Sequence, residues 1–252
     1  MITSILKIPV SSTNYIKATK KIRDIIINNK KVYICVAAVH LIMECQTDKK
    51  LLKGVQSADI ITPDGMPLVW LSRLYGNKKT SRVYGPDLTL VLCKLAEHFN
   101  YKVFFLGGSP AQSEQVMKRM ISKFPKLKVV GNIDTPIRPI PVIDNQKIIK
   151  TINKSKADIV FIGLGCPTQE LWMINNRSKL NIPILIGVGA AFDFITGKVN
   201  QAPLWTQNLG LEWLYRLKQE PRRLFNRYCI LNTLFISKIT KQIVVDLING
   251  KL

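Results

Sequence analysis

The chain has 252 residues, of which 47% are hydrophobic and 21% are charged. This composition excludes a mostly disordered protein, and the length suffices for one large domain or one domain with an appendage. A formal charge of +21, from 37 Lys and Arg against 16 Asp and Glu, indicates an anionic partner such as nucleic acid, a phosphorylated substrate or an acidic membrane surface.

Cysteine usage and the N-terminus predict the compartment. The five cysteines are widely spaced among apolar residues and show no spacing typical of a zinc site or a disulfide framework. The N-terminus lacks the apolar core of a signal peptide, and no run of about 18 apolar residues marks a membrane-spanning helix. We therefore expect reduced thiols and a cytoplasmic protein.

Apolar runs followed by a Gly-rich or polar turn and a helical pattern recur along the chain. This order predicts an α/β fold with a mostly parallel sheet flanked by helices. Strands are expected within residues 31–39, 103–108, 128–133, 157–165 and 182–191. Helices are expected within residues 86–100, 109–124 and 168–180, where apolar residues recur at helical spacing.

Two of the turns carry signals for a helix start. Ser109, Pro110 and Gln112 fit a capped N-terminus, and Pro167 and Thr168 follow a glycine-rich turn in a similar way. Such a terminus either receives a phosphate or merely connects two elements. None of the glycine-rich turns completes the dinucleotide-binding fingerprint, so a nicotinamide-dependent dehydrogenase is disfavoured.

The character of the chain changes after Gln201. Residues 202–228 mix Trp, Leu and Tyr with arginine, and Pro221 predicts a break between two short helices. Residues 227–252 form an amphipathic basic pattern, which fits a membrane surface as well as packing on the main domain or on a partner subunit. We predict an α/β core in residues 1–203 and a C-terminal appendage in residues 204–252.

The appendage is rich in arginine. Arg216, Arg222, Arg223 and Arg227 lie within one short stretch. Guanidinium groups form bidentate contacts with phosphate more readily than lysine does. This cluster is therefore a candidate anion site.

Two acids lie among apolar residues. Asp64, in IITPDGMPLVW, either stabilises the Pro-Asp-Gly turn or acts as a base whose dry surroundings raise its pKa. Asp193, in GAAFDFITG, is either a hydrogen-bonded structural acid or a ligand-binding one.

His40 follows an apolar strand and is either a buried core histidine or a catalytic one. No Ser/His/Asp, HExxH or DxD pattern is present, so neither triad hydrolysis nor a DxD-bound metal is expected. Arginines and helix ends would then have to balance any phosphate charge.

Six segments together resemble the WecG/TagA/CpsF family of bacterial glycosyltransferases, also called glycosyltransferase family 26. The segments lie in the family's order and the resemblance spans about residues 32–228: DGMPLVW, RVYGPDL, FFLGGSP, GLGCPTQE, GVGAAFDFITGKVNQAP and GLEWLYRLKQEPRRLFNRY. The resemblance implies a Rossmann-like fold of the GT-E type. It also implies inverting transfer from a UDP-sugar to a lipid-diphosphate-linked saccharide at the cytoplasmic membrane face, with no metal or other cofactor.

The resemblance also implies roles for individual residues. Asp64 matches the general base that deprotonates the acceptor hydroxyl, and Arg82 matches a pocket arginine. Gln169 and Asp193 match residues that hold the UDP-sugar. Three arginines match basic positions expected to close over the diphosphate and to offset charge on the leaving group: Arg216, Arg222 and Arg223.

The sequence departs from the family at one place. Many members carry a Thr-x-Asn pair where this chain has Val36 and Ala38. His40 is a candidate to replace part of the missing polarity, and the donor is left open.

We expect an inverting UDP-sugar transferase of surface-polysaccharide or teichoic-acid-type assembly, peripheral at the membrane and able to self-associate. The alternative is an inactive subunit that binds a UDP-sugar or a lipid diphosphate. A nucleic-acid binder rests on net charge alone and is not expected, because no recognisable binding motif is present.

Overall fold

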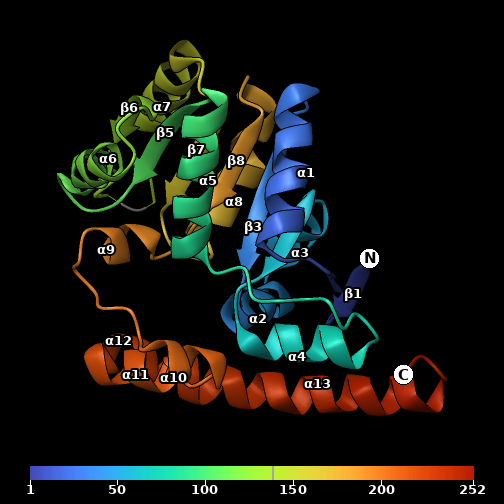
Figure 1. Ribbon diagram of the computed structural model, residues 1–252. Helices are drawn as coiled ribbons and strands as arrows, with labels where there is room; N and C mark the ends of the chain where they lie inside the picture. The colour runs from blue at the N-terminus through green and yellow to red at the C-terminus, as the bar shows by residue number, and fades with distance from the viewer. Residues whose placement is uncertain (138) are drawn as a thin grey trace.

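The computed structural model describes residues 1–137 and 139–252, and the side chains of Arg223, Asn226 and Arg227 lie outside this description. Its centre is a six-stranded parallel sheet with the order β4-β3-β8-β7-β5-β6 (Figure 1). The strands are β3 (Val32–Ala37), β4 (Ile60–Pro63), β5 (Lys102–Gly107), β6 (Lys128–Ile133), β7 (Ile159–Gly163) and β8 (Ile184–Gly187). The predicted α/β class with a Rossmann-like parallel sheet is confirmed.

Helices cover both faces of the sheet. One face carries α1 (Tyr15–Ile27), α5 (Gly85–Phe99), α6 (Gln112–Lys123) and α9 (Ala191–Ile195). The other carries α2 (Val39–Thr47), α3 (Lys49–Gln56), α4 (Met66–Leu74), α7 (Val142–Ser155) and α8 (Thr168–Asn176), which continues as a 3-10 turn (Arg177–Lys179). Neighbouring strand residues serve opposite faces: Phe104 packs in one apolar cluster and Phe105 in the other. Burial on both faces explains why β3, β5, β7 and β8 are nearly continuous apolar runs.

The structure corrects two details of the sequence analysis. Helix α6 begins at Gln112 rather than at Ser109, because the preceding residue, Ala111, has a left-handed backbone with a φ of +62°. The Ser109 N–H still donates to Gln112 Oε1 at 2.9 Å, as in a capping box. An N-terminal antiparallel hairpin, β1 (Ile2–Ile5) and β2 (Ile8–Ser11), was not predicted. Each of its strands has four residues, too few for a clear alternating pattern.

The C-terminal appendage lies across one end of the molecule, below α2 and α4 in Figure 1. It contains α10 (Leu204–Asn208), α11 (Glu212–Gln219), α12 (Pro221–Phe225), a π-helical turn (Asn226–Ile230) and α13 (Leu231–Ile248). The predicted break at Pro221 is confirmed, since α12 begins there. Phe235 and Ile239 of α13 are buried in the same apolar cluster as α2. No helix in the described part of the chain has the length and apolar character needed to cross a membrane.

The far half of α13 is tied to the N-terminal hairpin. Gln242 accepts from Leu6 N and donates to the Ser4 carbonyl, both at 2.8 Å. Tyr75 Oη, at the end of α4, donates to Asp246 Oδ2 at 2.6 Å. These contacts place α13 against the core through polar as well as apolar groups.

Candidate active site

A cavity of about 1040 Å³ lies between the carboxyl ends of β3 and β4 and the C-terminal appendage. The chain leaves β3 toward α2 on one face of the sheet and leaves β8 toward α9 on the other. In open α/β sheets, ligands bind in the crevice between two adjacent strands whose following connections lie on opposite faces of the sheet. Here that crevice lies between β3 and β8, and the cavity adjoins it on the side of β3 and β4.

Strand pairing places Asp64 at the mouth of this crevice. The Asp64 N–H donates to the Ala37 carbonyl at 2.8 Å, which extends the pairing of β4 with β3 by one residue. The Val83 N–H donates to the Pro63 carbonyl at 2.8 Å and brings the preceding residue, Arg82, against Asp64. The Asp64 side chain is 22% exposed and lines the cavity.

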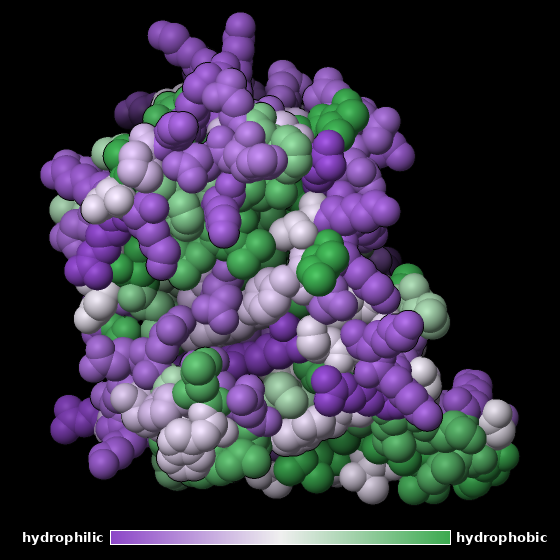
Figure 2. Space-filling model, viewed as in Figure 1, coloured by the Kyte–Doolittle hydropathy of each residue, from purple (hydrophilic) through white to green (hydrophobic). Residues whose placement is uncertain are grey.

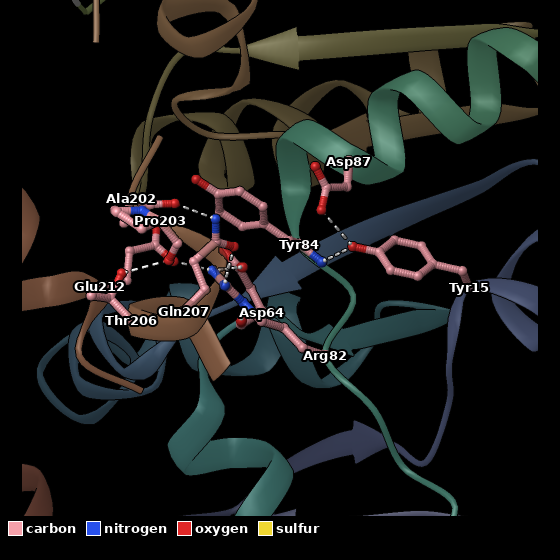
Figure 3. Close-up of polar contacts among 10 residues, drawn as sticks. All are labelled: Tyr15, Asp64, Arg82, Tyr84, Asp87, Ala202, Pro203, Thr206, Gln207 and Glu212. Carbon is pink, nitrogen blue, oxygen red and sulfur yellow. Dashed lines mark hydrogen bonds and ion pairs between the residues drawn. The ribbon is translucent and has the colours of Figure 1, made fainter. Parts of the chain in front are cut away.

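Arg82 links the core to the C-terminal appendage, as Figure 3 shows. Its Nη2 lies 3.4 Å from Asp64 Oδ1 and 2.5 Å from Glu212 Oε2 of α11. Its Nη1 donates to Gln207 Oε1 of α10 at 3.0 Å, and its Nε donates to the Asp64 carbonyl. The guanidinium also lies 4.1 Å from the centroid of the Tyr84 ring.

The charges of this group fix its protonation. Burial by itself would lower the pKa of Arg82, but the Asp64 and Glu212 carboxylates raise it above its ordinary value. Burial, and then the charges of Glu212 and Asp64, raise the pKa of the Tyr84 phenol. Arg82 therefore stays cationic and Tyr84 stays neutral.

Sequence reasoning missed Gln207 and Glu212. Glu212 is the first residue of α11, where the helix dipole favours an acidic side chain. Its position in the sequence therefore indicates a helix start and not a role in a site. Its partner Arg82 is 130 residues away in the chain.

The residues expected to hold the UDP-sugar lie beyond the cavity wall. Gln169 is 2% exposed, accepts from Gly189 N at 2.9 Å and donates to Glu170 Oε1 at 2.7 Å. Asp193 accepts from Gln112 Nε2 at 2.8 Å and lies 3.8 Å from Lys198 Nζ. Both lie just beyond β7 and β8, where Gln169 supports the loop after β8.

Arg216 connects the two regions. Its side chain lines the cavity, and its guanidinium lies 5.2 Å from the centroid of Phe194, the neighbour of Asp193 on α9. Arg216 is 8% exposed and its Nη2 lies 3.3 Å from Glu220 Oε2. A cation is thus held between the Asp64 region and the Asp193 region.

Of the other residues named from the sequence, some line the cavity and others lie outside its wall. His40 lines the cavity from α2, with its Nε2 3.0 Å from Glu44 Oε1. Ala38 also lines the cavity, whereas Val36 is buried in β3. Arg222 is exposed on α12, away from the described cavity wall, and the side chain of Arg223 lies outside the described residues.

The cavity wall has a charged part and an apolar part. The charged part contains Asp64, Arg82, Glu212 and Arg216. The apolar part is contributed from α4 by Trp70, Leu71 and Leu74 and from α13 by Phe235, Ile236 and Ile239. Such a cavity suits a ligand with a polar part and an apolar part. Among the described residues, no group of three or more His, Cys, Asp or Glu side chains could hold a metal ion.

Comparison with known proteins gives a consistent result. The model of the "Glycosyl transferase WecG/TagA/CpsF family" matches residues 3–247. A Bacillus subtilis protein named N-acetylglucosaminyldiphosphoundecaprenol N-acetyl-beta-D-mannosaminyltransferase is 32% identical over 176 residues, covering 70% of this chain and 67% of its own. A Bacillus spizizenii protein of the same name is 31% identical over 195 residues, covering 77% of this chain and 74% of its own.

Proposed function

The chain belongs to the WecG/TagA/CpsF family of glycosyltransferases, and on this premise we propose that it transfers a sugar from a UDP-sugar to a lipid-diphosphate-linked saccharide, with inversion. The observation that carries the proposal is the cavity, whose wall combines charged and apolar side chains. The two relatives are named for N-acetylmannosaminyl transfer to such a lipid, so UDP-N-acetylmannosamine is the first donor to test.

In the proposed reaction, Asp64 is the general base. It takes the proton of the acceptor hydroxyl while the hydroxyl oxygen attacks the anomeric carbon of the donor and the bond from that carbon to the UDP oxygen breaks. Arg216, near Asp193 on α9, supports this proposal because a guanidinium there would offset charge on the departing diphosphate. Arg222 and Arg223 are proposed to join it when the substrate is bound, and Gln169 and Asp193 to position the donor.

Docking on a membrane would give the protein access to a lipid acceptor. Several apolar side chains of α13 are exposed, among them Val245, Leu247 and Ile248. Figure 2 shows apolar residues gathered along the lower edge of the molecule, over α13, while much of the rest of this face is hydrophilic. We propose that the appendage docks this edge on the inner face of the cytoplasmic membrane, where the net positive charge favours anionic lipids.

The test is transfer from a panel of UDP-sugars to a lipid-diphosphate-linked N-acetylglucosamine, measured with and without a metal chelator. We expect one donor to be used, no loss on chelation, and a fall of roughly 10²–10⁴-fold in kcat for Asp64→Asn. Asp64→Asn at the wild-type rate would refute the base assignment, and no transfer from any donor would refute the function.

The second candidate is a subunit that binds a UDP-sugar or a lipid diphosphate without turnover. It is favoured by Ala38, an apolar side chain in the cavity wall where many family members carry Asn. Calorimetric binding of UDP together with no transfer from the whole panel would support this candidate over the transferase.

A further inference from the structure

The Arg82 guanidinium is shared between two carboxylates from different parts of the chain. Asp64 belongs to the core, and Glu212, which lies closer to Nη2 at 2.5 Å against 3.4 Å, belongs to α11. Gln207 of α10 binds the other terminal nitrogen at 3.0 Å. Two partners of Arg82 are therefore supplied only when the appendage is docked.

This division has a consequence for the charge on Asp64. An arginine with Asp64 as its one acidic partner would stabilise the carboxylate and make it a weaker base. Glu212 offsets that effect, both by taking the shorter contact and by adding a second negative charge beside Arg82. The side chains are 14–22% exposed, so water screens these interactions only in part.

We propose that Glu212 is a positioning residue that holds Arg82 when the appendage docks and so frees Asp64 to act as the general base. This inference rests on the proposed function and extends it. Asp64 would then accept a proton efficiently only when the appendage is docked, and this requirement would limit transfer of the sugar to water.

Other groups around Asp64 do not replace Glu212 in this role. His40 and Arg216 line the same cavity, and Tyr84 and Tyr15 are near enough to Asp64 for its charge to raise their pKa. Burial is the larger cause for both phenols, which stay neutral. Glu212 is thus the acidic group of the described cavity wall that faces Asp64 across Arg82.

The test compares the titration of Asp64 in full-length variants. Glu212→Gln keeps the shape and can still accept from Arg82, but it removes the charge. In the profile of kcat against pH, we expect the midpoint of the acid limb to move down by roughly one pH unit, because the carboxylate of Asp64 loses a negative neighbour. We expect kcat on the plateau to fall about tenfold, because Asp64 becomes a weaker base. The Asp64 carboxyl resonance, followed by ¹³C NMR, should move in the same direction without any substrate.

Three variants serve as controls. Glu212→Asp keeps the charge and should keep the wild-type midpoint. Gln207→Ala removes a neutral contact to Arg82 and should leave the midpoint in place, whatever its effect on kcat. Glu114→Gln makes the same chemical change on α6, where Glu114 pairs with Lys118, and should leave both quantities unchanged.

The outcomes separate this inference from the function on which it rests. The role of Glu212 is overturned if the Asp64 midpoint is unchanged in Glu212→Gln while resistance to trypsin shows that the appendage is still docked. Failure of the wild-type protein to transfer any sugar overturns the proposed function instead. Equal midpoint shifts in Glu212→Gln and Gln207→Ala would assign the effect to docking alone and also overturn the charge argument.

Discussion

At the scale of single residues, Ala38 and His40 form the part of the cavity wall that lies beside Asp64. A Cβ added at Gly65 would lie 3.9 Å from Ala38 Cβ, so Ala38 lies against the turn that carries Asp64. His40 is two residues further on and supplies an imidazole to the same wall. We infer that His40 provides polar contact where an Asn is missing.

This inference predicts the behaviour of two substitutions. His40→Ala should lower kcat/KM for the preferred UDP-sugar about three- to tenfold, the size expected for one hydrogen bond. Ala38→Asn introduced into His40→Ala should restore part of the loss. Donor kinetics with the acceptor at saturation measure both effects, and wild-type kinetics in His40→Ala would rule out a donor contact.

At the scale of elements, the contact between α4 and the turn after α10 depends on a glycine. Gly210 has a φ of +70°, and a Cβ there would lie 2.6 Å from Trp70 Cη2. Both the backbone conformation and the close approach favour glycine at this position. Trp70 and Gly210 both line the cavity, so this contact also shapes the site.

We predict that Gly210→Ala loosens the docking of α10 and α11. The left-handed backbone costs about 1–2 kcal/mol with a side chain, and the clash with Trp70 adds to that cost. The expected results are faster tryptic cleavage at Lys and Arg residues of the appendage, within residues 204–252, and a lower rate of transfer. Gly250→Ala is the matched control, because Gly250 has a φ of +66° and no atom within 4 Å of its added Cβ. Equal cleavage rates in the two variants would contradict the prediction.

At the scale of the whole molecule, the appendage is both a cover for the cavity and an apolar edge. Phe235 and Ile239 face the core, whereas Val245 and Ile248 face outward. Removal of residues 204–252 would expose core surface as well as remove the edge. Single substitutions on the outer side therefore test membrane docking more cleanly than the deletion does.

We predict that Ile248→Asp weakens binding to anionic vesicles roughly tenfold, because one apolar side chain no longer enters the membrane interface. Ile248 and Ile16 are both 80% exposed, but Ile16 belongs to α1 and not to the appendage. Ile16→Asp makes the same chemical change and should retain vesicle binding. Co-sedimentation with vesicles at two salt concentrations measures both, and equal losses would indicate a purely electrostatic attachment.

The sequence by itself determined the elements whose signals are local. Strands buried on both faces are continuous apolar runs, so β3, β5, β7 and β8 could be predicted. The edge strand β6 and the helix break at Pro221 could be predicted as well. Asp64 could be singled out because an acid between apolar residues is uncommon. The family motifs then supplied the class of enzyme.

Only the tertiary structure decided which side chains meet. Glu212 and Gln207 reach Arg82 from 130 and 125 residues away, and Gln242 reaches the N-terminal hairpin from 236 residues away. Gln169, matched to the site by its motif, proved to be buried behind the cavity wall. Such contacts depend on strand order and on helix docking, neither of which leaves a periodic pattern in the chain. The sequence therefore determined the framework and its base candidate, and the docking of the C-terminal helices decided the charges around that base.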